Sequence, residues 1–221
     1  MKKVISVMLL LAMLVSASSC STKVTEKDKD KVGGDVSDSA EWNSGETSGQ
    51  VYTSSFGGFK LTAPDENWVF ASEEEILEKM DIATDSDILT DSQKRAAEIG
   101  KQKTIYDAVL TDLTSGSNVI IMYENLSLTL GASKIDASQY ANTLKTQLEA
   151  TGQYTVDAPQ TISFLNESYV RVDSTATIEG VTLSQTYLLK KIDKYMLAIC
   201  ITPGITSGIT VDSMMAMFSN I

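Results

Sequence analysis

Few residues in this sequence could carry out catalysis at neutral pH. The 221 residues include no His and two Cys, which excludes a Ser-His-Asp triad, a Cys-His pair and mixed Cys/His zinc sites. No Ser has a Lys three positions later, and the sequence contains no Gly-x-Ser-x-Gly elbow and no glycine-rich phosphate loop. Acidic residues are abundant, but no pair of carboxylates stands out for glycoside chemistry. We therefore expect a protein that is not an enzyme and that needs no cofactor.

The strongest candidate for a metal site is the acid-rich segment from Asp81 to Asp91. Carboxylate oxygens on a loop would suit Ca²⁺. The EF-hand pattern fails, however, because Leu89 and Thr90 stand where the calcium loop needs a glycine. We prefer the alternative that these acids cap the starts of helices, and we assign no metal ligand.

The first 20 residues have the pattern of a bacterial lipoprotein signal. Two Lys precede the apolar run Val4–Val15, which is too short to span a bilayer. Residues 17–20, Ala-Ser-Ser-Cys, resemble a lipobox, although Ala17 stands where Leu is usual. This resemblance implies cleavage before Cys20 and transfer of a diacylglyceryl group to its thiol. The alternative is an ordinary secreted protein that begins with a stray Cys.

Lipid attachment at Cys20 would hold the folded part at a membrane, facing the extracytoplasmic side. Each buried CH₂ of the acyl chains, which would be of the palmitate class, contributes ~0.8 kcal/mol, so two chains give a stable anchor. Cleavage removes two Lys and no acid, so the net charge changes from −11 to −13. Such an acidic chain disfavours nucleic acid and anionic lipid as partners. The expected partners are the lipid bilayer, through acylated Cys20, and another extracytoplasmic protein.

Two further groups of sulfur-containing residues leave a choice between function and core packing. Cys200 lies in the apolar run Tyr195–Ile201, and these neighbours favour a buried core thiol over a reactive one. Near the end of the chain, Met214, Met215 and Met217 could form an adaptable binding face. We prefer core packing for this group as well, with Met217 as its exposed member.

Composition divides the chain into three parts. Residues 1–19 are the predicted signal peptide, and residues 20–50 are the lipidated Cys followed by an acidic linker. The linker is expected to be disordered because it has too little apolar surface to offset its ordering entropy. Trp42 stands apart in it, either as a docking motif or as an isolated exposed residue. Residues 51–221 have the length of a single domain.

Residue periodicity predicts that this domain is mostly β. Strands are expected in a hairpin or meander over residues 51–70, and then over residues 104–113, 118–126, 169–178, 181–190 and 194–202. Glu179-Gly180 has the form of a two-residue hairpin turn, which would bring Ala176 opposite Leu183. The run Asn118–Tyr123, like Tyr195–Ile201, is apolar at both odd and even positions. These strands must therefore be covered on both faces.

Three helices are predicted around the strands, and a weaker pattern favours a short fourth helix around Asp91–Gly100. The clearest spans Asp136–Thr151, with Asp136 as its N-cap and Gln139 at the third helical position. A capping box at Ser72 predicts a second helix, and apolar spacing from Val211 to Phe218 predicts a third. The expected fold class is therefore α+β, an antiparallel sheet flanked by helices in an α/β/α sandwich. The alternative is that the second face of the sheet meets a partner.

The opening run Phe59-Lys-Leu-Thr-Ala-Pro64, followed by Trp68-Val-Phe70, resembles the entry strands of the Mog/PsbP-like family. The predicted order of elements is similar too, and the resemblance covers nearly all of residues 51–221. It implies a PsbP-like sandwich and, because most members are binding or assembly subunits, a non-catalytic binding module. The alternative is a carrier of a small or apolar ligand in a pocket between sheet and helix. Metal binding in the photosynthetic members relies partly on His, so no ligand is carried over to this chain.

Overall fold

The computed structural model describes residues 42–76, 103–128, 134–178, 180–205 and 207–221. The predicted signal peptide, Cys20, the segment from Asp81 to Asp91 and the short helix predicted around Asp91–Gly100 lie outside these residues. So does most of the helix predicted after Ser72, of which residues 73–76 are helical. Ser72 forms the expected capping box there, because its Oγ accepts from the Glu75 amide at 3.3 Å and its amide donates to the Glu75 carboxylate at 2.8 Å.

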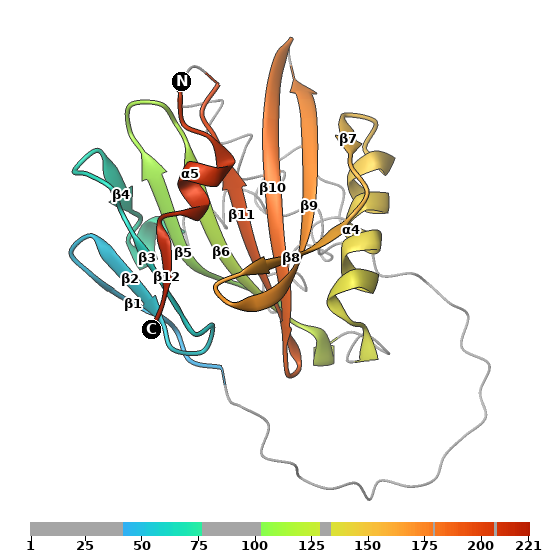
Figure 1. Ribbon diagram of the computed structural model, residues 1–221, viewed down its shortest axis with the longest axis horizontal. Coiled ribbons are helices and arrows are strands. Elements are labelled where there is room, and N and C mark those ends of the chain that lie inside the picture. Colours follow the sequence, from blue (N-terminus) through green and yellow to red (C-terminus); the bar gives the residue numbers. More distant parts are fainter. Residues whose placement is uncertain (1–41, 77–102, 129–133, 179, 206) are drawn as a thin grey trace, which may run out of the picture.

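The larger of two antiparallel sheets follows the order β4-β5-β6-β11-β10-β9-β7, with β8 paired to β9 (Figure 1). Its strands are β4 (Trp68–Phe70), β5 (Thr104–Asp112), β6 (Asn118–Asn125), β7 (Tyr154–Val156), β8 (Gln160–Phe164), β9 (Glu167–Ile178), β10 (Val181–Ile192) and β11 (Tyr195–Thr202). The hairpin register is confirmed, since Ala176 lies opposite Leu183. β4 leaves the opening meander and pairs with β5 instead. The sequence had indicated neither β7 nor β8.

Both faces of the central strands β6 and β11 are covered, as their composition predicts. Every residue of β11 is buried, and so is every residue of β6 except Asn125. On one face the side chains pack against α4 (Ala137–Ala150), which contributes Ala141, Leu144 and Leu148. On the other face they belong to a second cluster. Alternate residues of one strand therefore stabilise two different layers.

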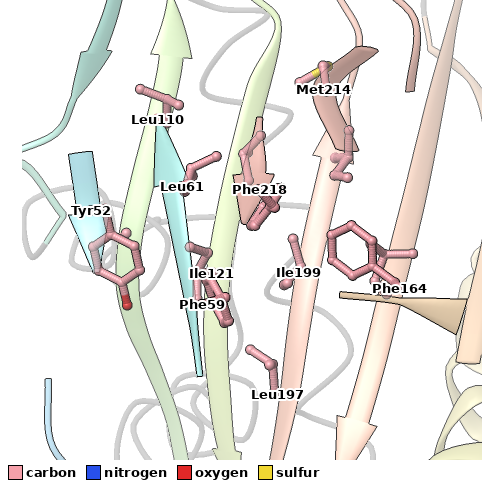
Figure 2. Packing of buried hydrophobic residues seen from close by; sticks show 14 of the residues in the cluster. Tyr52, Phe59, Leu61, Leu110, Ile121, Phe164, Leu197, Ile199, Met214 and Phe218 are labelled. Carbon is pink, nitrogen blue, oxygen red and sulfur yellow. The ribbon is translucent and has the colours of Figure 1, made fainter. Parts of the chain in front are cut away.

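The layer on the second face is a sheet, which corrects the predicted α/β/α sandwich. This sheet has the order β1-β2-β3-β12 and consists of β1 (Glu46–Ser48), β2 (Val51–Ser54), β3 (Phe59–Thr62) and β12 (Phe218–Asn220). Figure 1 shows β12, near the end of the chain, beside β3, near its start. Phe59 and Phe218 of this sheet lie over Ile121 and Ile199 of the larger one (Figure 2). The antiparallel sheet is as predicted, but the protein contains more β-structure than the predicted α/β/α sandwich would.

The end of the chain departs from the predicted long amphipathic helix. α5 (Val211–Met215) has five residues, and Phe218 lies in β12 rather than on a continuing helix. The reason is tertiary: the backbone of Phe218 pairs with Leu61, and its ring packs 5.6 Å from the ring of Phe59. Spacing of three and four residues was correct for Val211 to Met215, but sheet pairing overrides it at Phe218.

The longest described helix, α4, forms as its sequence predicts. The Asp136 carboxylate accepts from the Gln139 amide at 2.8 Å, and the Gln139 side chain accepts from the Asp136 amide at 3.0 Å. Both bonds satisfy amides that have no partner within the helix. Gly152 follows the last turn with φ +72°, a conformation that glycine adopts without strain. A 3₁₀ turn, η2 (Leu126–Leu128), follows β6.

Part of the segment that composition assigns to the disordered linker belongs to the fold. β1 pairs with β2, with Glu46 opposite Thr53. The three residues of β1 are exposed, so backbone pairing holds the strand and hydropathy gives no sign of it. Trp42 is half-buried and packs 6.3 Å from the ring of Tyr123, so it is not the isolated exposed residue of one prediction.

Candidate functional site

The sulfur-containing residues that the sequence singled out are mostly core. Met214 is fully buried, and Met215 and Met217 are half-buried against the second-sheet cluster. The expectation that Met217 would be exposed is therefore wrong, because β12 returns the chain to the sheet directly after it. Cys200 is buried and unpaired on the α4 side of β11, as predicted. Cys20 lies outside the described residues, so its lipidation remains a prediction.

Burial is the largest influence on the pKa of the Cys200 thiol and raises it to about 12. We expect stability to fall as the pH rises from about 9, where the thiol of the unfolded chain ionises, toward 12. The sign follows because the folded protein keeps this proton over the interval in which the unfolded chain loses it. Urea unfolding at pH 7.5 and pH 10 measures the effect. Burial also raises the pKa values of Tyr154 and Tyr187, so their ionisation in the unfolded chain likewise lowers stability at high pH.

Cys200→Ala separates the thiol from the tyrosines. The variant keeps the tyrosines but has no ionisable thiol, so we expect it to lose less stability between pH 7.5 and pH 10 than the parent. An equal loss in both proteins would contradict the assignment of part of the pH dependence to Cys200.

A charged group lies within the α4 side of the larger sheet, where the sequence had indicated none. Glu124 is buried, with 7% of the residue exposed. It pairs with Lys103 Nζ at 2.5 Å and accepts from Tyr140 Oη at 2.5 Å, so a buried charge is neutralised and hydrogen-bonded. Nearby on β5, the hydroxyls of Thr104 and Tyr106 are buried without a hydrogen-bond partner. Burial raises the pKa of Tyr106.

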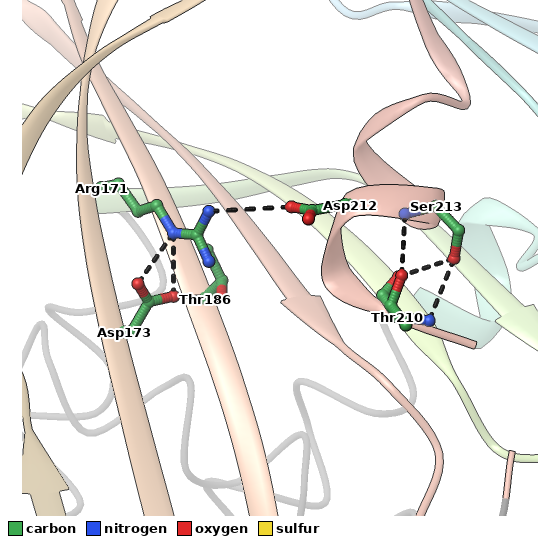
Figure 3. Close-up of polar contacts among 6 residues, drawn as sticks. All are labelled: Arg171, Asp173, Thr186, Thr210, Asp212 and Ser213. Carbon is green, nitrogen blue, oxygen red and sulfur yellow. Dashed lines mark hydrogen bonds and ion pairs between the residues drawn. The ribbon is translucent and has the colours of Figure 1, made fainter. Parts of the chain in front are cut away.

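A second polar group connects β9, β10 and α5 on the opposite face (Figure 3). Arg171 Nε donates to both carboxylate oxygens of Asp173, at 3.0 and 2.8 Å. Asp173 also accepts from the Thr186 hydroxyl at 2.5 Å, which fixes the acid. Arg171 Nη1 lies 3.9 Å from the carboxylate of Asp212, which is 89% exposed. The alternation in β9 predicts that Arg171 and Asp173 share a face, but it gives no sign of α5 beside them.

Beyond this group, the far end of the β9–β10 hairpin carries a row of exposed hydroxyls. Thr175 lies opposite Ser184, and Thr177 lies opposite Thr182. All four residues are exposed, whereas their neighbours that point to the α4 side are buried: Ser174, Ala176, Leu183 and Gln185. We refer to Arg171, Thr175, Thr177, Thr182 and Ser184 as the open face. It consists of a hydroxyl-rich sheet surface with one guanidinium at its edge.

The described residues show two further absences. Among them, no set of three His, Cys, Asp or Glu side chains is placed to hold a metal ion. Within the same ranges, no helix is both long and apolar enough to cross a membrane.

Comparison with known proteins gives a likeness to solved structures. No family model matches the chain, and no curated protein matches it. Among solved structures, the chain is similar to PsbP (CyanoP) from the cyanobacterium Synechocystis sp. PCC 6803, with 12% identity and a TM-score of 0.44. The similarity covers 87% of this chain and 99% of the other. An identity and a TM-score this low assign neither a family nor a function.

Proposed function

We propose that this protein is a membrane-anchored extracytoplasmic lipoprotein that acts as a non-catalytic binding or assembly module. The N-terminal pattern ending at Cys20 supports the anchor and the extracytoplasmic side. In this proposal the bilayer holds acylated Cys20, and the partner of the folded part is another extracytoplasmic protein. Nucleic acid is not a partner, because the chain is strongly acidic.

The open face is the observation that carries the binding role. One side of the β9–β10 hairpin is packed beneath α4, and the other side presents exposed hydroxyls, with Arg171 four residues before Thr175 on β9. Hydroxyls donate and accept, and a guanidinium whose Nε is already held by Asp173 has its terminal nitrogens oriented. Such a surface suits polar contacts with a protein partner.

Site-specific photo-crosslinking in the native host tests this role. A photoreactive amino acid at Thr177 or Ser184 is expected to give a discrete adduct with one membrane-associated or extracytoplasmic protein. The same amino acid at Asn142, exposed on α4, is the control and should give none. Arg171→Glu should lower the yield of the adduct from Thr177. Identical adducts from all three positions, or none from either position on the open face, would contradict the proposal.

One observation favours the second candidate, a carrier of a small or apolar ligand between sheet and helix. The hydroxyls of Thr104 and Tyr106 are buried on the α4 side without hydrogen-bond partners. A bound ligand would supply those partners. Native mass spectrometry of the protein extracted from membranes would show such a ligand as an added mass. That mass should be lost in Tyr106→Phe, and a bare protein mass would exclude the carrier.

A further inference from the structure

Residues 42–48, which we refer to as the strap, lie along the edge of the second sheet. Their last three residues form β1 on β2, and their first residue, Trp42, packs on Tyr123. The side chains of β1 are all exposed. Apart from half-buried Trp42, the strap buries little apolar surface, so local opening should cost far less than unfolding of the core.

Asp107 holds the strap to the domain. Its carboxylate accepts from the Ser44 hydroxyl at 2.9 Å and from the Gly45 amide at 3.1 and 3.3 Å. It also accepts from the hydroxyl of Tyr52. The register of β5 shifts between Tyr106 and Ala108, so Asp107 occupies a bulge, a feature that redirects a side chain. The bulge thus supplies a carboxylate that binds one backbone amide of the strap.

Gly45 fits its position because it has no side chain. A Cβ added there would lie 2.4 Å from the ring of Tyr52. Tyr52 is 1% exposed and hydrogen-bonded to Asp107, so its ring cannot move away easily. Any larger residue at position 45 should therefore push the strap off the domain.

The surface beneath Trp42 is aromatic. Phe56 packs edge-on against Tyr123 at 5.5 Å and against Tyr195 at 5.4 Å. Trp42 Nε1 is buried without a hydrogen-bond partner, which makes the closed strap less favourable. With the strap removed, β2 becomes the sheet edge, next to these rings and the Asp107 carboxylate. An edge strand beside side-chain pockets is the arrangement that binds extended peptides by strand addition.

We propose that the strap is a releasable cover over a peptide-binding groove formed by the edge of β2, the rings of Phe56 and Tyr123, and the Asp107 carboxylate. The occupant of the open groove is an extended segment of a partner protein with an aromatic residue three positions before a glycine, because that is the chemistry of the strap seated there. The inference goes beyond the proposed function, since it depends neither on the lipid anchor nor on the open face.

Binding of a labelled peptide to the full chain tests the groove. The probe has the sequence of residues 41–49, Glu-Trp-Asn-Ser-Gly-Glu-Thr-Ser-Gly, with a fluorophore at one end. Gly45→Val in the protein should expel the strap and raise the affinity for the probe by about tenfold or more over the parent. Probes carrying Trp42→Ala or Gly45→Val should not bind. Gly208→Val is the matched control, because a Cβ at position 208 meets nothing within 4 Å.

Amide hydrogen exchange shows whether the strap, and only the strap, has opened. In Gly45→Val, residues 46–53 should exchange faster while β6 and β11 stay protected. If β6 and β11 also lose protection, the binding measurement is made on Trp42→Ala, which removes the aromatic contact without adding volume. The proposal is overturned if the variant that keeps its core binds the probe no better than the parent. It is equally overturned if that variant binds all three probes alike, or if Gly208→Val gains the same affinity.

Discussion

Replacing Cys20 with Ser is expected to release the protein from the membrane fraction into the supernatant. The hydroxyl of Ser forms no thioether, so the variant receives no diacylglyceryl group. It is produced behind a secretory signal that is cleaved before residue 20, because an uncleaved apolar run Val4–Val15 would itself hold the chain at a membrane. Two acyl chains contribute ~0.8 kcal/mol for each buried CH₂, and we expect nothing else in this acidic chain to replace that contribution. Cell fractionation followed by detergent phase partition measures the shift, which should involve most of the protein.

Cys200→Ser is the matched control for the anchor. It removes the other cysteine of the chain, but this residue is buried in the core and takes no part in the anchor. The control should stay in the membrane fraction. If Cys20→Ser stays there as well, the acyl anchor is wrong.

Phe59→Ala is expected to destabilise the domain by about 3–5 kcal/mol, the usual cost of removing a fully buried aromatic side chain. Phe59 is 0% exposed and packs on the rings of Tyr52 and Phe218. The substitution therefore leaves a cavity where the second sheet meets the larger one. The free energy of unfolding, from urea titration followed by far-UV circular dichroism, measures the loss.

Val69→Ala is the control for this prediction, because Val69 on β4 is 44% exposed. We expect its effect to stay within about 0.5 kcal/mol, as for most exposed sites. If Phe59→Ala cost no more than the control, the second sheet would not be an integral layer of the fold.

Local features were predictable from the sequence where a short-range pattern determines them. The capping box of Asp136 and Gln139 and the register that sets Ala176 opposite Leu183 depend on neighbours a few residues apart. Apolar residues at both parities of Tyr195–Ile201 also predicted, correctly, that β11 is covered on two faces.

The nature of the second cover was not predictable in the same way. Hydropathy shows that a face is buried, but not whether a helix or a sheet covers it. The covering sheet pairs Phe218 with Leu61, which are far apart in the chain, and no local pattern encodes that contact. β1 was missed for a related reason, since its exposed side chains give no periodic signal and its backbone pairing holds it.

The polar residues of the candidate site were also predictable only where a local sequence pattern determines them. The buried state of Cys200 followed from its apolar neighbours, and the shared face of Arg171 and Asp173 followed from strand alternation. The contacts of Glu124 with Lys103, and of Asp107 with Gly45, join segments that the sequence alone could not place together.

Mass spectrometry of the N-terminal tryptic peptide tests the central claim, a lipid-anchored domain, most directly. The protein is extracted from membranes of its native host, and the peptide spanning Cys20 to Lys23 is analysed. We predict a peptide that begins at Cys20 and carries a diacylglyceryl group on its sulfur. A peptide with an unmodified thiol at Cys20, or one still joined to residue 19, would contradict the account.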